Sequence, residues 1–348
     1  MDQNFYFNNL ESTELTDRIF QLIDQAENYI KTGNFFFQDP KFHTVLLAAA
    51  KRGVAIFILS NLSGNENRSD TSARYAKVET DPHIPNLHEL HRNGIHVRCN
   101  DNLHAKFLLC DGAAGLLMSA NYTPNSLYGN PESGIDLSGQ ELADMEFVFD
   151  KLFTGADIKL SEDGKQYRYL RSENPLPANT FDKVGTTSRL RLTAASRTQT
   201  NLAACRVRTL YNSIIDIIRT AEHELMIVSW SFNQVKQLPE FQSALQAAIQ
   251  RGVDVHLYYN NEAEPQKVKR TETQLKELLG TALFQRICHP FPYNHSKCVL
   301  SEKDGILFTA NIDGRSGLTS GFELGCLLNN DQRNKALSRI KQLTKNGK

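Results

Sequence analysis

A histidine and a lysine two residues apart form the first pattern in the chain that could do chemistry. His104 and Lys106 stand in the stretch LHAKFLLCDGAAGLLMSAN. Side chains two apart on a strand point to the same face, so an imidazole and a fixed cation are expected side by side. Such a pair suits a phosphate oxyanion next to a nucleophile. Three further polar residues follow in the same stretch: Asp111, Ser119 and Asn121.

The same spacing recurs 191 residues later, in the stretch YNHSKCVLSEKDGILFTAN. His295 and Lys297 repeat the histidine-lysine pair, and Thr309 and Asn311 follow them. The acidic residue of the second copy is displaced. Two residues are candidates for its position, Glu302 and Asp304.

The segments around the two pairs repeat as well. Apolar residues at helical spacing recur at a constant offset of 195: Ile19, Ile23 and Ala26 are answered by Ile214, Ile218 and Ala221. Helix and strand patterns alternate in the same order in both parts of the chain. This alternation predicts α/β layers, and the repetition predicts two similar halves related by a pseudo-two-fold axis.

The expected domains are a first half at 1–157, a connecting segment at 158–204 and a second half at 205–348. A polar stretch without periodicity, 61–80, is predicted to be a long loop. Residues 183–208 contain six basic and no acidic residues. That run is either a solvated face of the connection or a contact for a polyanion.

Composition narrows the class of protein. The 348 residues carry 39 basic and 39 acidic side chains, so no overall field attracts nucleic acid or an anionic membrane. No apolar run approaches membrane-spanning length, and the first residues lack the pattern of a signal peptide. The six cysteines show no paired spacing, which indicates free thiols in a reducing compartment. We therefore expect a cytoplasmic protein.

With these two motifs the chain resembles the phospholipase D superfamily, the HKD-motif phosphodiesterases. The family pattern is His-x-Lys-x4-Asp followed by Gly-Ser-x-Asn. The first copy fits, with Met118 at the glycine position, and the second has Phe308 there. The resemblance implies an α/β fold of two α-β-α sandwich halves with mixed sheets, arranged as a pseudo-dimer within one chain. It also implies that the two histidine-lysine strands meet at the junction.

For such a site we expect a two-step cleavage of a phosphodiester. One neutral histidine attacks phosphorus and forms a phosphohistidine, and the other protonates the leaving oxygen and then activates water. We assign His104 as the nucleophile and His295 as the acid. Four side chains are expected to stabilise the phosphoryl oxygens: Lys106, Lys297, Asn121 and Asn311.

The remaining site residues have supporting roles. Ser119 and Thr309 are candidate hydroxyl donors. Asp111, and either Glu302 or Asp304, are expected to order nearby loops. Family precedent places a carboxylate behind each histidine to fix its tautomer, and the candidates are Glu146 and Glu323.

The lysines supply the charge, so no metal or other cofactor is expected. The favoured substrate is DNA or RNA. A phospholipid, cleaved by a phospholipase D or a cardiolipin-synthase-like transphosphatidylase, is the alternative. A catalytically decayed binding protein is a further one. The sequence leaves the oligomeric state open, and a monomer with an internal pseudo-dimer is compatible with it. Trp230 is predicted to pack in the core, and Arg315 is either a substrate contact or a turn residue.

Overall fold

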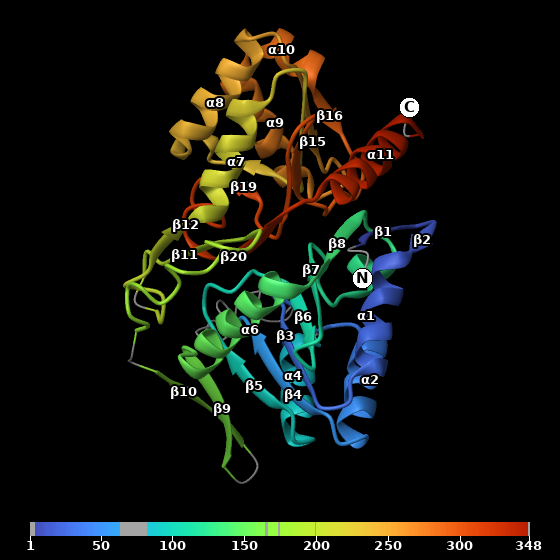
Figure 1. The fold of residues 1–348 in the computed structure, drawn as a ribbon, viewed down its shortest axis with the longest axis vertical. Coiled ribbons are helices and arrows are strands. Elements are labelled where there is room, and N and C mark those ends of the chain that lie inside the picture. Colours follow the sequence, from blue (N-terminus) through green and yellow to red (C-terminus); the bar gives the residue numbers. More distant parts are fainter. Residues whose placement is uncertain (1–3, 63–81, 164–165, 173–174, 199, 347–348) are drawn as a thin grey trace.

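The fold consists of two mixed β-sheets, each covered by helices, stacked along the long axis of the molecule (Figure 1). The computed structural model describes residues 4–62, 82–163, 166–172, 175–198 and 200–346. The predicted loop at 61–80 lies almost entirely outside these residues. Ten strands form the sheet of the first half and eight that of the second.

The first sheet has the strand order β10-β9-β5-β4-β3-β6-β7-β8-β1-β2. Strands β3, β4 and β5 run parallel to one another, and the other neighbours are antiparallel. Its strands are β1 (Phe5–Asn9), β2 (Ser12–Thr13), β3 (Tyr29–Gly33), β4 (Ala55–Ser60), β5 (His96–Cys99), β6 (Phe107–Cys110), β7 (Ala114–Met118), β8 (Glu132–Leu137), β9 (Ile158–Asp163) and β10 (Gln166–Arg171).

The second sheet has the order β12-β11-β20-β18-β17-β13-β15-β16, again with three parallel strands, β13, β15 and β16. Its strands are β11 (Leu190–Ala195), β12 (Arg206–Arg208), β13 (Glu224–Ser229), β15 (Asp254–Tyr259), β16 (Cys288–Pro290), β17 (Cys298–Ser301), β18 (Gly305–Phe308) and β20 (Gly321–Leu327). A separate two-stranded sheet joins β14 (Phe232–Asn233) to β19 (Ile312–Asp313).

Eight strands of each sheet correspond. The order β5-β4-β3-β6-β7-β8-β1-β2 in the first half is matched by β16-β15-β13-β17-β18-β20-β11-β12 in the second. The predicted α/β fold with two mixed-sheet halves is therefore confirmed. In both halves the histidine-lysine pair leads into the strand beside the three parallel ones, β6 or β17.

Helices cover both faces of each sheet, because each helix carries one apolar stripe. In the first half α1 (Glu14–Gln25) and α2 (Pro40–Lys51) pack on one face, and α6 (Gly139–Thr154) packs on the other. In the second half α7 (Thr209–Thr220) and α8 (Pro239–Gln250) face α11 (Asn330–Asn346) across the sheet. The remaining helical elements are α4 (His83–Arg92), α5 (Pro124–Tyr128), η1 (Val235–Gln237), α9 (Pro265–Leu279) and α10 (Thr281–Ile287).

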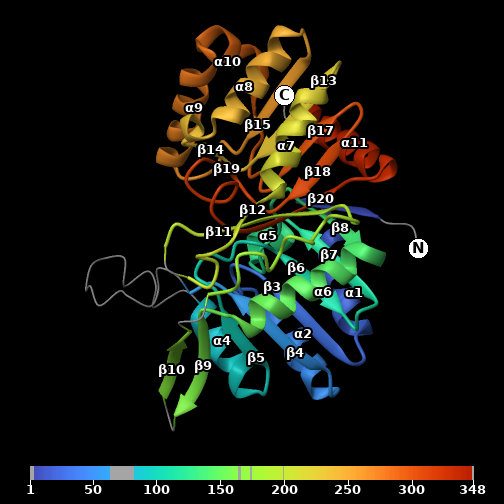
Figure 2. The ribbon, with the colours of Figure 1, turned by 60° about the vertical axis from the view of Figure 1, so that its left-hand side comes forward.

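The two halves share one hydrophobic core. Leu103 and Phe107 of the first half belong to the same buried cluster as Phe322 and Leu324 of the second. Helix α6 lies against β11, and α11 lies against β1 (Figures 1 and 2). Burial of this shared apolar surface fixes how one motif faces the other.

Residues 158–204, expected to connect the halves, contribute strands to both sheets. The β9–β10 hairpin adds to the edge of the first sheet beside β5. Strand β11 pairs along its whole length with β20 in the second sheet. The short apolar alternation of these strands is too weak to be recognised in a polar stretch.

The prediction for Glu146 was wrong. The run MEFVF was expected to be a strand, but it lies in α6, where Met145, Phe149 and Leu152 are buried at helical spacing. Glu146 accepts hydrogen bonds from Tyr29 and Lys31, at 3.2 and 2.5 Å, and does not touch either motif histidine. A five-residue apolar run fits both periods, and here the longer helical stripe decides.

The acidic residue of each motif braces the turn that precedes the first parallel strand of its half. Asp111 accepts backbone N–H bonds from Glu27, Asn28 and Tyr29 at 2.7–2.8 Å. These bonds lower the pKa of Asp111, because they stabilise its charged form. In the second half Glu302 receives the equivalent bonds from residues 222–224, and its pKa falls to about 2. Glu302, and not Asp304, is therefore the counterpart of Asp111.

We expect Asp111→Asn to lower the free energy of unfolding by about 1–2 kcal/mol, the value of charge-assisted hydrogen bonds at a partly exposed site. Asparagine keeps the acceptor oxygen and tolerates the left-handed backbone found here, with φ of 56°. Urea unfolding at neutral pH measures the change. Because the folded-state pKa is lowered, this stability exists above the ordinary carboxyl pKa and is lost as the pH falls. The difference between wild type and variant should shrink as the pH falls from the ordinary carboxyl pKa of about 3.9 through the lowered pKa of folded Asp111. A difference that does not shrink over that range would contradict the charge-based explanation.

Candidate active site

Each histidine-lysine motif is hydrogen-bonded to the opposite half of the molecule. The backbone N–H groups of His104 and Ala105 donate to the carbonyl of Phe322, both at 3.1 Å. In the second motif, the N–H groups of His295 and Ser296 donate to the carbonyl of Pro131 at 2.9 and 2.8 Å. The pairs lie in the extended segments that lead into β6 and β17. The two motifs therefore meet at the junction of the halves.

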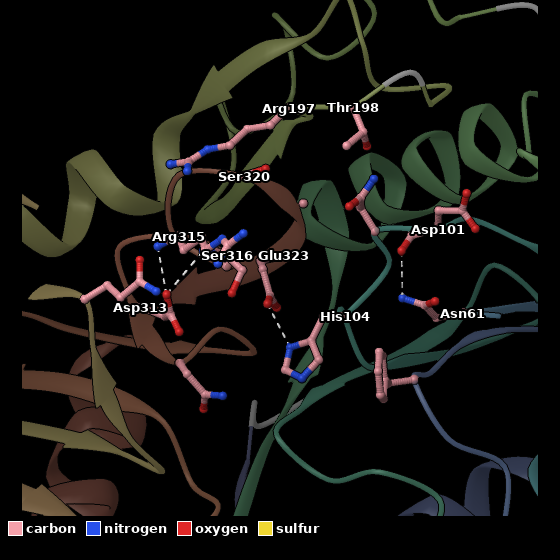
Figure 3. Close-up of a pocket in the computed structure, with 16 residues that line it drawn as sticks. Asn61, Asp101, His104, Arg197, Thr198, Asp313, Arg315, Ser316, Ser320 and Glu323 are labelled. Atoms are coloured by element: carbon pink, nitrogen blue, oxygen red, sulfur yellow. Dashed lines mark hydrogen bonds and ion pairs between the residues drawn. The ribbon is translucent and has the colours of Figure 1, made fainter. Parts of the chain in front are cut away.

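A carboxylate from the other half lies behind His104. Nδ1 of His104 is 2.7 Å from Oε1 of Glu323, which is buried in β20 (Figure 3). A carboxylate only accepts, so Nδ1 carries the proton and Nε2 of the neutral ring is left with a free lone pair. Glu323 was one of the two candidates for a carboxylate behind a histidine, and it contacts the histidine of the opposite half.

The counterpart of Glu323 is Glu132, which the sequence analysis missed. Nδ1 of His295 lies 2.8 Å from Oε1 of Glu132, a fully buried residue of β8. Within the described residues neither atom has another polar partner, so each depends on the other. The signal was present in the sequence: Glu132 lies 191 residues before Glu323, the same offset that separates the two histidines. The carboxylates are thus exchanged between the halves.

Ser119 and Thr309 hold these carboxylates in place. Both hydroxyls were expected to point at the phosphate. Ser119 Oγ instead donates to Oε2 of Glu132, and Thr309 Oγ1 donates to Oε2 of Glu323. Both residues are completely buried, so their hydroxyls satisfy carboxylate oxygens that would otherwise lack partners.

Lys106 and Lys297 are completely buried beside the histidines. Each ammonium donates to the carbonyl of the histidine two residues earlier, at 2.6 Å in both cases. Burial lowers the pKa of Lys106 to about 7 and that of Lys297 to about 8. Each lysine keeps donors unused by these bonds, because an ammonium has three.

Burial also lowers the pKa of both histidines. For His295 it falls to about 4, because desolvation outweighs the attraction of Glu132 and the nearby Lys297 also disfavours a second positive charge. For His104 desolvation acts in the same direction, and Lys106 and Lys297 add to it. Each histidine thus senses the lysine of the opposite half. The lowered pKa values favour the neutral form of both rings at pH 7.

Asn121 and Asn311 complete the repeated set. The side-chain oxygen of each is buried, and within the described residues it has no hydrogen-bond partner. Buried amide groups in proteins are normally satisfied, and one that is not is often found where a ligand binds. These oxygens accept hydrogen bonds and suit a donor on a ligand, whereas a phosphoryl oxygen is contacted by the amide N–H₂ groups of the same two side chains.

A cavity of about 620 Å³ opens beside His104 (Figure 3). Most of the residues that line it are polar or charged, among them His104, Glu323, Asn311, Gln234, Arg197 and Arg315. Arg315 had been left open as a turn or substrate residue, and it lines this cavity. The side chain of His104 is 27% exposed and that of His295 is 16% exposed. A ligand can thus reach His104 from the cavity.

No group of three or more His, Cys, Asp or Glu side chains in the described residues is arranged to hold a metal ion. Among the same residues, no helix combines the length and apolar character needed to cross a membrane.

Comparison with known proteins supports the assignment from the motifs. Residues 19–153 match the family model of the cardiolipin synthase, PLD-like domain, and residues 205–278 match that of the N-terminal effector-binding subdomain of the transcriptional regulator TrmB. No curated protein matches the chain.

Three solved structures are similar to the chain. Phosphatidylserine synthase from Haemophilus influenzae aligns with a TM-score of 0.67 and 14% identity, over 97% of this chain and 85% of its own. Polyphosphate kinase from Porphyromonas gingivalis aligns with a TM-score of 0.58 and 12% identity, over 98% of this chain and 50% of its own. Nuc from Salmonella typhimurium, a phospholipase D family member, is 19% identical over 49% of this chain and 100% of its own, with a TM-score of 0.36.

The fold of two corresponding halves, the paired motifs at their junction and the family match over residues 19–153 support an assignment to the phospholipase D superfamily.

Proposed function

We propose that the protein is a metal-independent phosphodiesterase that works through a phosphohistidine and acts on nucleic acid. The observation that carries this proposal is the crossed pair of histidine-carboxylate contacts, His104 with Glu323 and His295 with Glu132. Both imidazoles are held in the tautomer that leaves Nε2 free for chemistry. The second histidine is then available for the proton transfers that the first cannot perform.

In the first step Nε2 of His104 attacks phosphorus, and a P–N bond forms as the P–O bond to the leaving group breaks. The leaving oxygen takes the proton of Nε2 on His295. In the second step Nε2 of His295 takes a proton from water, the water oxygen attacks phosphorus, and the P–N bond breaks. The phosphoryl oxygens are stabilised by Lys106, Lys297, Asn121 and Asn311. We assign the nucleophile to His104 because its side chain lines the cavity.

The polar lining of the cavity favours nucleic acid over phospholipid. Six large hydrophobic side chains are exposed in the described residues, and none of them lines the cavity: Leu10, Tyr128, Phe147, Tyr169, Leu170 and Tyr293. Within the described residues, the only large apolar side chain that lines the cavity is therefore Phe35, which offers little surface for acyl chains. The likeness to a phosphatidylserine synthase keeps phospholipid as a second candidate.

The basic run at 183–208 contributes to this proposal through one residue. Arg197 lines the cavity. Arg189 pairs with Glu141, and Arg191 and Arg206 donate to nearby backbone carbonyls. We propose that Arg197 contacts the phosphate backbone beside the scissile bond, where it adds to affinity without reading sequence.

A decayed site was the third alternative, suggested by the displaced acid of the second motif. Glu302 makes the same backbone contacts as Asp111, so the shifted acid of the second motif still holds the turn before the first parallel strand. This argues for an active enzyme.

A panel of substrates tests the proposal. The protein is incubated in EDTA with labelled single-stranded DNA, duplex DNA, RNA and phosphatidylglycerol vesicles, and with bis(p-nitrophenyl) phosphate as a general diester. We expect cleavage of the general diester and of nucleic acid. Headgroup release without nucleic-acid cleavage would select the phospholipid alternative. If neither the wild type nor His104→Asn cleaved any of these substrates, the result would select the alternative of a catalytically decayed binding protein.

The rate should depend on pH with a bell-shaped profile whose maximum lies below pH 6.5. The first step needs one charged and one neutral histidine. Since both histidine pKa values are lowered from 6.5, the singly protonated pair is lost as the pH rises through the lowered values. Loss of the lysine protons near pH 7–8 steepens the alkaline limb. The measurement is kcat/KM for bis(p-nitrophenyl) phosphate from about pH 4 to about pH 9. A maximum above about pH 7.5 would contradict this account.

A further inference from the structure

An aromatic side chain lies edge-on beside each motif histidine. The ring of Phe35 is 5.3 Å from that of His104, centroid to centroid, at an interplanar angle of 66°. The ring of Trp230 is 6.4 Å from that of His295, at 68°. Trp230 was expected to be a core residue, but its side chain is only partly buried.

Phe35 and Trp230 occupy corresponding positions in the repeat. They are 195 residues apart, the offset that relates α1 to α7, and each follows closely on the first parallel strand of its half, β3 or β13. The pseudo-two-fold arrangement therefore provides one aromatic ring on each side of the site. This is the same symmetry that relates His104 to His295.

Both rings are partly exposed, and neither belongs to one of the buried hydrophobic clusters of the described residues. Phe35 lines the cavity beside His104. Trp230 has the ammonium of Lys267 at 5.4 Å from its ring centroid, and Lys267 is in turn paired with Glu264 at 2.9 Å. A cation over an indole face is attracted to it, which restrains the ring. A restrained, partly exposed aromatic ring in polar surroundings is suited to stack on a planar ligand group.

We propose that Phe35 and Trp230 are stacking platforms for the two bases that flank the scissile phosphate, so that the preferred substrate is single-stranded nucleic acid. This inference rests on the phosphodiesterase proposed above and names its substrate class. A phosphate between the two histidines has one nucleotide on the side of each aromatic ring. Every base has a π face, so such platforms bind strands without sequence preference, but only when the bases are not paired and stacked in a duplex.

The chain contains a single tryptophan, so Trp230 itself reports on binding. The full-length His104→Asn variant, which cannot turn over, is titrated with an eight-nucleotide oligothymidylate while tryptophan fluorescence is recorded. We expect saturable quenching. An abasic strand with the same number of phosphates should bind, as followed by anisotropy of an end label, without quenching. Phosphatidylglycerol vesicles should leave the fluorescence unchanged.

Three outcomes would overturn the stacking proposal: equal quenching by the abasic strand, quenching by vesicles alone, or binding of oligothymidylate by anisotropy with no change in fluorescence. No binding of either strand would overturn it as well. Hydrolysis of bis(p-nitrophenyl) phosphate by the wild type separates these failures from a failure of the phosphodiesterase itself.

Substitutions provide a second, independent readout. Phe35→Leu and Trp230→Leu should each raise KM for the oligothymidylate by roughly 10- to 100-fold, while cleavage of the abasic strand changes little. The matched control is Phe36→Leu. Phe36 touches Phe35, with ring centroids 4.4 Å apart, but it does not line the cavity. A purely structural role for Phe35 or Trp230 would lower cleavage of both strands alike.

Discussion

His295→Asn should accumulate a covalent phosphoryl-enzyme on His104 when it is given a substrate with an activated leaving group. Bis(p-nitrophenyl) phosphate loses p-nitrophenolate without needing a proton donor, so the first step survives. The second step fails, because no base remains to activate water. We expect a burst of about one equivalent of p-nitrophenolate and a steady-state rate lowered by roughly 10³-fold or more.

The companion variant His104→Asn should give no burst and no label, because it lacks the nucleophile. Intact-mass measurement under alkaline conditions, where phosphohistidine survives, detects the adduct, and peptide mapping locates it. A label on His295 in the His104→Asn protein would reverse the two roles. Absence of an adduct in both variants, with full activity in either, would rule out covalent catalysis by these histidines.

Glu132→Gln and Glu323→Gln should each lower kcat by roughly 10²- to 10⁴-fold with little change in KM. Each carboxylate fixes the tautomer of a histidine in the opposite half and stabilises the imidazolium that forms during proton transfer. Glutamine retains the size but not the charge, and its amide can turn its N–H₂ group toward Nδ1. Steady-state kinetics with a nucleic-acid substrate and with bis(p-nitrophenyl) phosphate measure the loss.

Glu146→Gln is the matched control for the carboxylate variants. Glu146 is a partly buried glutamate of the first half with a cationic partner, Lys31, but it contacts neither motif histidine. We expect its activity to stay within roughly threefold of wild type. If Glu146→Gln were as inactive as Glu132→Gln, the exchange of carboxylates between the halves would not be the cause of the loss.

The sequence by itself identified the candidate catalytic residues that lie close together along the chain. The prediction that His104 and Lys106 lie side by side, and likewise His295 and Lys297, requires only the geometry of an extended segment. The repeat predicted two corresponding α/β halves, because an amphipathic helix followed by a buried strand is a local pattern. Applied to every acidic residue, the offset of 191 that relates the two histidines would have identified Glu132 as the counterpart of Glu323.

Only the tertiary structure decided which carboxylate serves which histidine. Glu323 and His104 are 219 residues apart, and their contact depends on how the two halves dock through the shared core. The sequence also does not tell which of these side chains are buried and which are exposed. Burial of Lys106 and Lys297 lowers their pKa values, and partial exposure of Trp230 turns an expected core residue into a candidate ligand contact. Contacts between distant segments and the solvation of each group arise from packing, which local periodicity does not encode.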